Sequence, residues 1–213
     1  GGFHRKTEAL LGLHPDVAIV QECAPPSKWM HTCRGWHAIW HGADSPIGVG
    51  ILAPEGSALS LGAPLTNEIR CFLPAHVQAA ASFGILGCWT KQGRPGQRSY
   101  VGQLALALDE YADFLASQPC LVVGDLNSNA IWDRGKPWQH LAVTERLRTL
   151  GLVSVDHHFF QEEHGDERLP TYRHNTGQPF HLYYCYLPAA WLDRVRSVQV
   201  GGDEWLHLSD HRP

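Results

Sequence analysis

Short runs of apolar residues alternate along the chain with polar turns rich in Gly, Pro, Asp and Ser. Runs of four to eight apolar residues between such turns are typical of buried strands. On this basis we expect strands at residues 17–21, 36–40, 48–52, 70–80, 82–90, 121–123, 152–155, 183–187 and 195–200.

Three segments instead show helical signals. Leu104, Leu108, Tyr111 and Leu115 recur at the spacing of one helix face, which predicts a helix over 100–116. Further helices are expected at 3–12 and 138–150, where Gly12 and Gly151 provide stop signals. Strands interspersed with a few helices predict the α/β class, as a two-sheet mixed β-sandwich flanked by helices. No linker interrupts the pattern, so we expect a single domain over residues 1–213.

Composition narrows the choice of compartment and partner. The chain has 213 residues, of which 44% are hydrophobic, enough for a substantial core. The formal charge is −4, and the sequence has no basic stripe. Both features argue against a protein that coats nucleic acid through a positively charged surface. No stretch is long and apolar enough for a membrane span. The six scattered cysteines predict free thiols rather than a disulfide framework, and hence a cytoplasmic protein.

Polar side chains follow two of the predicted strands and end the chain. Glu22 follows the strand at 17–21, and Asp125 and Asn127 follow the strand at 121–123 after a turn at Gly124. Open α/β sheets commonly build their sites at such strand ends. Taken alone, each motif also has an ordinary explanation: a carboxylate that caps a turn, an Asp-x-Asn turn, or a polar loop at Ser209-Asp210-His211.

Three motifs in this order resemble the endonuclease/exonuclease/phosphatase superfamily, which includes deoxyribonuclease I and exonuclease III. They are Gln21-Glu22, Gly124-Asp125-Leu126-Asn127 and Ser209-Asp210-His211. The resemblance implies the deoxyribonuclease I-like four-layer sandwich and a Mg²⁺ cofactor, with Mn²⁺ as an alternative. Relatives carry a metal-binding Asn on an opening strand and add a strand after Ser-Asp-His. We therefore expect residues 1–213 to lack the first and last strands of the domain.

The resemblance also assigns roles that suit hydrolysis of a phosphoester. Glu22 would hold the metal, and Asp125 and Asp210 would prepare the attacking water. Asn127 would donate a hydrogen bond to a phosphoryl oxygen, and His211 as imidazolium would stabilise charge in the transition state.

Two positions depart from the family pattern. Relatives use an Asp to orient the catalytic histidine, within a pattern like His-Ile-Asp-Tyr. The corresponding segment here is His181-Leu182-Tyr183-Tyr184, so Tyr183 occupies the position of that Asp. A tyrosine cannot supply the charge that favours imidazolium, so we expect a weaker, more pH-sensitive site or no turnover. Trp89 stands where many relatives place a phosphate-contacting His or Tyr. It is either a substrate contact or a core aromatic.

Other candidates rest on residue type alone. Arg94, Arg98 and Arg173 could bind substrate phosphate, although solvated loops are the ordinary explanation for the first two.

A zinc site at Cys33, His37 and His41 is disfavoured, because i and i+4 residues of a strand lie far apart. His157 and His158 are expected at the surface rather than as ligands.

The sequence therefore predicts a Mg²⁺-dependent phosphoesterase that acts on phosphodiester bonds, with nucleic acid as the leading substrate. One alternative is a catalytically impaired binding module of the same fold. Another is a phosphatase acting on phospholipid or small phosphoester substrates. No feature of the sequence predicts an oligomeric state.

Overall fold

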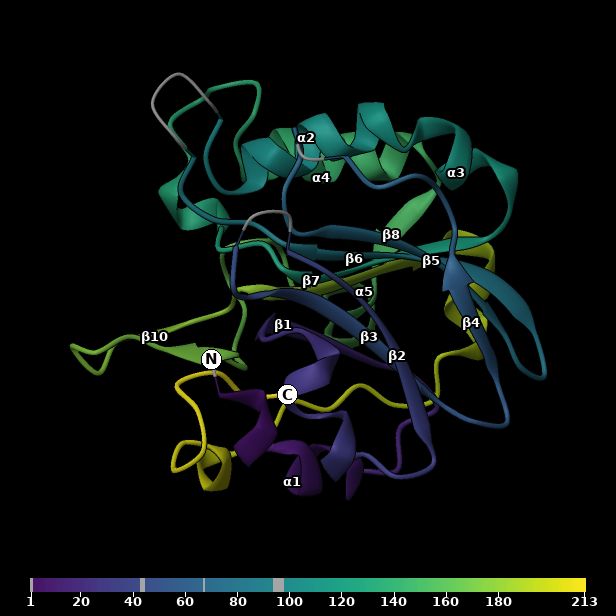
Figure 1. The fold of residues 1–213 in the computed structure, drawn as a ribbon. Coiled ribbons are helices and arrows are strands. Elements are labelled where there is room, and N and C mark those ends of the chain that lie inside the picture. Colours follow the sequence, from purple (N-terminus) through teal and green to yellow (C-terminus); the bar gives the residue numbers. More distant parts are fainter. Residues whose placement is uncertain (1, 43–44, 67, 94–97) are drawn as a thin grey trace. The chain divides into compact units, whose positions relative to one another are not determined.

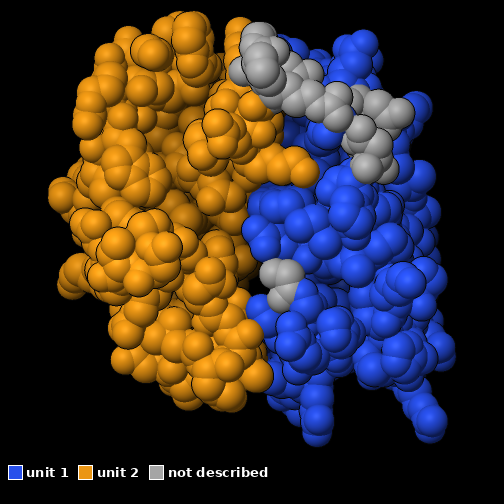
Figure 2. All heavy atoms as spheres, turned by 60° about the vertical axis from the view of Figure 1, so that its left-hand side comes forward, with its two compact units in different colours: residues 1–89, 106–124 blue, residues 90–105, 125–213 orange. Residues whose placement is uncertain are grey.

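The computed structural model describes residues 2–42, 45–66, 68–93 and 98–213. The chain forms two compact units, which Figure 2 distinguishes by colour. Unit 1 comprises residues 1–89 and 106–124, and unit 2 comprises residues 90–105 and 125–213.

Unit 1 contains two arrangements of strands, in which β1–β3, β2–β3, β4–β5 and β5–β6 pair in antiparallel fashion. The smaller sheet has the order β1-β3-β2, and in the larger sheet β4, β5, β6 and β7 follow one another. The strands are β1 (Ala18–Cys23), β2 (Trp36–His41), β3 (Gly48–Pro54), β4 (Ala58–Leu61), β5 (Phe72–Gln78), β6 (Ser82–Trp89) and β7 (Cys120–Asp125). The last residue of β7, Asp125, is the first residue of its segment of unit 2.

The two sheets of unit 1 enclose an apolar core. Val49 and Ile51 of β3 belong to one buried cluster with Leu73 and Ile85 of β5 and β6. Gly87 keeps the sheets close, since a Cβ at that position would lie 3.2 Å from side-chain atoms of Val49 and Ile51. Burial of such aliphatic side chains is the main favourable contribution to folding.

Helical segments cover the outer faces of both sheets in unit 1 (Figure 1). Phe3 packs edge-to-face on Trp29 at 4.9 Å, within the cluster on the outer side of the smaller sheet. Phe114 contacts His76 of β5, with ring centroids 5.5 Å apart. The resulting order of helix, sheet, sheet and helix confirms the predicted four-layer sandwich. The helical segments of unit 1 are η1 (Phe3–Arg5), α1 (Thr7–Leu11), η2 (Pro26–Lys28), η3 (Met30–Thr32) and α3 (Ala112–Ser117).

Unit 2 is built around the antiparallel pair β8 (Leu152–Ser154) and β11 (Tyr183–Pro188), in which Tyr186 lies opposite Ser154. A second pair joins β9 (Tyr172–Arg173) to β10 (Pro179–Phe180). Its helical segments are η4 (Ala130–Trp132), α4 (His140–Thr149), α5 (Val155–Phe160), η5 (Ala189–Arg194) and η6 (Asp203–Trp205). The helix α2 (Val101–Glu110) contributes residues to both units.

Most predicted elements are present, and the differences have local causes. The helix expected over 100–116 is interrupted at Tyr111, whose backbone (φ −102°, ψ 22°) separates α2 from α3. The strand expected at 195–200 is irregular, and its valines at 195, 198 and 200 do not keep the alternation of a strand. The strand β4 and the helix α5 were not predicted. Among the described residues, no helix is both long and apolar enough to span a membrane.

Gly124 allows β7 to pass close to β6, which makes it a sensitive position. Its φ is +148°, and a Cβ there would lie 1.9 Å from the backbone oxygen of Cys88. We predict that Gly124→Ala lowers the free energy of unfolding by about 2–4 kcal/mol, because backbone strain and a backbone clash combine. Urea denaturation measures this change. Gly56→Ala is the control, since no heavy atom lies within 4 Å of its added Cβ, and equal losses in the two variants would contradict the prediction.

Candidate active site

The turn after β7 holds two predicted site residues in direct contact. Asp125 is 1% exposed. Its Oδ1 accepts a hydrogen bond from the Asn127 backbone N–H at 2.8 Å, and its Oδ2 accepts one from Asn127 Nδ2 at 2.9 Å. Asn127 Nδ2 also donates to the Thr90 carbonyl at 2.8 Å. Both N–H groups of the amide are thus engaged, so donation to a phosphoryl oxygen would require Asn127 to exchange one of these bonds.

Two of the predicted site residues have left-handed backbone conformations. Glu22 has φ +54° and Asn127 has φ +42°. Glu22 lies where the register of β1 against β3 shifts between Val20 and Cys23, which is a β-bulge or irregularity. Bulges redirect side chains, and strained non-glycine residues cluster at functional sites. The backbone at both positions therefore supports a functional assignment that the sequence motifs suggested.

Asp210 and His211 lie beside β9. His211 forms an isolated bridge with Tyr172, and the Arg173 N–H donates to the Asp210 carbonyl at 2.8 Å. The ring of Tyr183 stacks on the imidazole of His211, with centroids 5.1 Å apart and planes at 22°. Tyr183, which replaces the expected Asp, is therefore adjacent to the histidine and contacts it through the ring face.

Thr171 links these segments to the turn after β7. This buried residue accepts hydrogen bonds at Oγ1 from the backbone N–H groups of Leu182 (2.8 Å) and Tyr183 (3.1 Å). The Leu126 N–H in turn donates to the Leu182 carbonyl at 3.0 Å. Hydrogen bonds of the backbone and of the Thr171 hydroxyl thus join the segments of unit 2 that carry Asp125, Asn127, Tyr183, Asp210 and His211.

The other predicted site residues lie in different surroundings. Glu22 and Trp89 belong to unit 1, and Trp89 is 5% exposed within its core cluster. This burial favours the alternative interpretation of Trp89 as a core aromatic. Arg94 lies outside the described residues.

Two predicted phosphate-binding arginines are exposed. The guanidinium carbon of Arg98 lies 5.6 Å from the ring centroid of Trp138, a cation–π contact. Arg173 has a side chain 46% exposed, with Nη2 3.5 Å from Asp203 Oδ1. A substrate phosphate would compete with Asp203 for Arg173.

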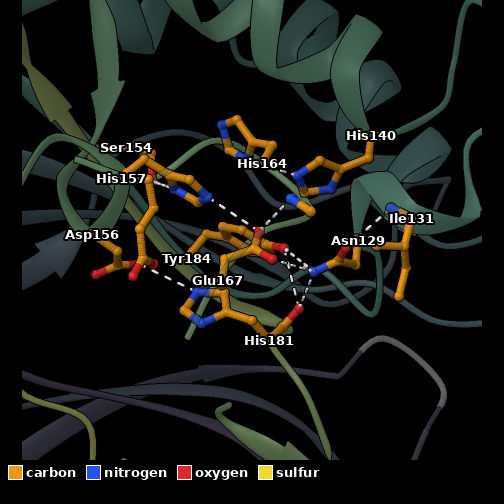
Figure 3. A network of polar contacts seen from close by, with 12 residues as sticks. Asn129, Ile131, His140, Ser154, Asp156, His157, His164, Glu167, His181 and Tyr184 are labelled. Carbon is orange, nitrogen blue, oxygen red and sulfur yellow. Dashed lines mark hydrogen bonds and ion pairs between the residues drawn. The ribbon is translucent and has the colours of Figure 1, made fainter. Parts of the chain in front are cut away.

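A second polar cluster, the histidine cluster, lies in unit 2 and was not predicted (Figure 3). It is centred on His140, His157, His164 and Glu167. The surface position expected for His157 is wrong: its side chain is 9% exposed, because α5 turns it inward beside Glu167, whose side chain is 5% exposed. His158, its neighbour on α5, is exposed as expected.

Glu167 is held by several hydrogen bonds. Its Oε1 lies 3.1 Å from His157 Nε2 and accepts from the Gly165 N–H at 3.0 Å, while Oε2 accepts from Asn129 Nδ2 at 3.0 Å. Burial disfavours its charge, but these hydrogen bonds outweigh burial and lower the pKa of Glu167 to about 2. A buried carboxylate is therefore kept ionised.

The imidazoles of this cluster are held by neighbouring polar groups. Nδ1 of His157 lies 2.7 Å from Ser154 Oγ. Nδ1 of His164 lies 3.1 Å from His140 Nε2, whose own Nδ1 lies 3.2 Å from Ser128 Oγ. Burial, with a smaller contribution from nearby imidazoles, lowers the pKa of His140 to about 3 and that of His164 to about 4. Both rings are therefore neutral at neutral pH.

Metal-ligand geometry occurs within the histidine cluster. Potential ligand atoms of His157, His164 and Glu167 all lie within 4.8 Å of one another, and no other such group is found in the described part of the chain. The set Cys33, His37 and His41, which the sequence disfavoured as a zinc site, does not form one.

Solved structures share this fold. No protein-family model and no curated protein matches the chain by sequence. The structure is similar to the 3′ phosphatase NExo from Neisseria, bound to a product DNA hairpin, with TM-score 0.69 and 19% identity over 98% of this chain and 91% of that chain. It is also similar to the endonuclease domain of TRAS1, a telomere-specific non-LTR retrotransposon, with TM-score 0.67 and 14% identity over 98% and 87% of the two chains.

A third similar structure is an AP endonuclease from Archaeoglobus fulgidus, with TM-score 0.65 and 18% identity over 98% of this chain and 91% of that chain. The fold is that of the endonuclease/exonuclease/phosphatase superfamily, as the sequence motifs predicted.

Asn129 connects the histidine cluster to the turn after β7. It is 2% exposed, and its Nδ2 donates to Glu167 Oε2 and to the His181 carbonyl at 3.0 and 3.1 Å. We predict that Asn129→Ala lowers the free energy of unfolding by about 2–3 kcal/mol, because buried acceptors lose a partner. Urea denaturation tests this, with exposed Asn175→Ala as the control. Similar midpoints for the two variants would show that the amide bonds contribute little.

Proposed function

We propose that this protein is a divalent-metal-dependent phosphoesterase that hydrolyses phosphodiester bonds in nucleic acid. The observation that carries the proposal is the joining of Asp125, Asn127 and His211 by the hydrogen-bonded segments of unit 2, on a fold shared with nucleases. A scaffold has no physical need for a carboxylate, an amide and an imidazole together in this arrangement. The DNA product bound to one of the similar structures supports a nucleic-acid substrate.

The residues of unit 2 can divide the work of in-line attack on phosphorus. The Asp125 carboxylate is ordered by two hydrogen bonds from Asn127, and it would orient a water and accept its proton. Asn127 would hold a phosphoryl oxygen by exchanging one of its amide bonds. His211 as imidazolium would donate to the same group and stabilise its charge.

The donor groups proposed for the metal fit Mg²⁺. Glu22 and Asp210 offer carboxylate oxygens, and hard ions such as Mg²⁺ and Mn²⁺ prefer oxygen ligands. Glu22 would hold the ion, and Asp210 would help to prepare the attacking water. The bound ion would neutralise phosphate charge and favour ionisation of water.

Tyr183 supports a second candidate function, a nucleic-acid-binding module with impaired turnover. Its ring stacks on His211 where relatives are expected to carry an Asp. A stacked phenol offers no negative charge to favour the imidazolium form of His211. Hydrolysis measurements separate the two candidates.

The first prediction from the proposed function concerns Asp125. With Mg²⁺, the protein should cleave plasmid DNA or bis(p-nitrophenyl) phosphate, and EDTA should abolish cleavage. Asp125→Asn should reduce the rate about 100-fold or more, because the amide cannot accept the proton. Exposed Asp113→Asn should retain the rate. A folded protein that binds DNA without cleaving either substrate, with or without Mg²⁺, would support the binding module.

A second prediction concerns Tyr183. Tyr183→Asp should raise the hydrolysis rate and move the alkaline limb of the pH–rate profile upward by about one unit or more, because a carboxylate beside an imidazole raises its pKa. Tyr183→Phe keeps an aromatic ring for the stack and should leave that limb in place. If the profiles of Tyr183→Asp and Tyr183→Phe coincide, position 183 does not govern His211.

A further inference from the structure

The histidine cluster places two imidazoles and one carboxylate within reach of a common ion. His157 comes from α5, and His164 and Glu167 follow in the next turn. The separation of His157 Nε2 from Glu167 Oε1 is 3.1 Å. Two ligands of one tetrahedral zinc lie about 3.3–3.5 Å apart, given bond lengths near 2.0–2.2 Å. This pair is therefore already close to the spacing that a shared ion requires.

The third ligand is also close. One imidazole nitrogen from each of His157 and His164 and one carboxylate oxygen of Glu167 lie within 4.8 Å of one another. Small side-chain adjustments would bring all three atoms to one ion. The rings of His157 and His164 stack with centroids 3.7 Å apart and planes at 29°. Neither ring needs to leave the cluster to share an ion.

Neighbouring groups orient each of these side chains. Ser154 Oγ lies at Nδ1 of His157, His140 Nε2 lies at Nδ1 of His164, and Asn129 binds the second carboxylate oxygen of Glu167. Metal-binding histidines and carboxylates commonly have such partners, which fix the ring tautomer and orientation. The Ser154 hydroxyl can donate or accept, so it can accept from Nδ1–H when Nε2 of His157 binds a metal.

The packing also calls for a compensating interaction. Burial of His140, His157 and His164 removes their imidazoles from water, and their polar partners are neutral serine hydroxyls, one another and the single carboxylate of Glu167. A divalent ion would interact with all three ligands at once and offset this desolvation.

We propose that His157, His164 and Glu167 form a zinc site, with a fourth position for water. Imidazole nitrogen favours Zn²⁺ over Mg²⁺, so this site would select a different metal from the oxygen groups of the proposed active site. Bound zinc would stabilise α5 and the turn at 161–167 in their positions beside Asn129 and Tyr184. Asn129 Nδ2 donates a hydrogen bond of 3.4 Å to the Tyr184 hydroxyl. The proposal does not depend on phosphoesterase activity.

Zinc binding to the full chain tests this site without measuring turnover. The protein is stripped with a chelator, which is then removed, and Zn²⁺ is titrated in competition with a chromophoric chelator. We expect one Zn²⁺ per chain and a higher unfolding temperature when it is bound. His164→Ala and Glu167→Gln should lose this stoichiometric binding and the rise in unfolding temperature.

Two exposed neighbours provide matched controls. His158→Ala and Glu163→Gln remove the same chemical groups from α5 and the same turn, and both should bind Zn²⁺ like the original chain. Circular dichroism without metal establishes whether each variant is folded. Failure of the original chain to bind stoichiometric Zn²⁺, or unchanged binding in folded His164→Ala and Glu167→Gln, would overturn the proposal.

X-ray absorption of the zinc-loaded original chain provides a test that needs no variant. Two imidazoles and one carboxylate should give a nitrogen and oxygen shell near 2.0–2.1 Å with the outer scattering of two imidazole rings. A spectrum with sulfur ligands or without imidazole scattering would overturn the assignment.

Discussion

The turn that follows β7 is the constraint on which the candidate active site depends. The Thr90 N–H donates to the Asp125 carbonyl at 2.9 Å, the Thr90 hydroxyl donates to the Leu126 carbonyl, and the Leu126 N–H donates to Leu182 at 3.0 Å. Asn127 closes the turn by bonding both the Asp125 carboxylate and the Thr90 carbonyl. Backbone groups inside a protein must find partners, and here that requirement determines where the Asp125 carboxylate, the proposed general base, lies. A left-handed φ at Asn127 is tolerated because these bonds outweigh its strain.

The sequence predicted the layers of the fold better than the arrangement of the site. Buried strands such as β3 and β6 were visible as apolar runs, because side chains on both of their faces are covered. By contrast, β4 is largely exposed and α5 is a single short segment, so neither has a strong periodic pattern. The motifs containing Asp125, Asn127 and His211 suggested a common site. The segments that carry these residues are connected through Thr171 and Leu182. These connections are hydrogen bonds between residues distant in sequence, which no local sequence pattern encodes.

The histidine cluster shows a different limit of sequence reasoning. His157 and His158 are adjacent and chemically identical, yet α5 turns one inward and leaves the other exposed. His140 reaches the cluster from α4, distant in sequence from His157 and His164. Among 14 histidines, spacing alone does not distinguish these three. The useful signal would have been Glu167 following His157 and His164 within one short segment, a weak pattern without the fold that brings their side chains together.

The residues proposed for the two metals differ in donor chemistry, and this difference would give the two ions separate roles. The proposed Mg²⁺ ligand Glu22 offers hard oxygens, which would suit an ion that must keep water and substrate in its coordination sphere. His157 and His164 offer imidazoles, which bind zinc strongly and would suit a structural role for the ion. Asn129 donates a hydrogen bond to Glu167 in the histidine cluster and is two residues from Asn127. Zinc bound to Glu167 would therefore also stabilise the turn that positions Asp125. Because the same segment carries Asp125 and Asn129, loss of the proposed zinc would loosen the turn without removing any proposed catalytic side chain, and hydrolysis would decline through the positioning of Asp125.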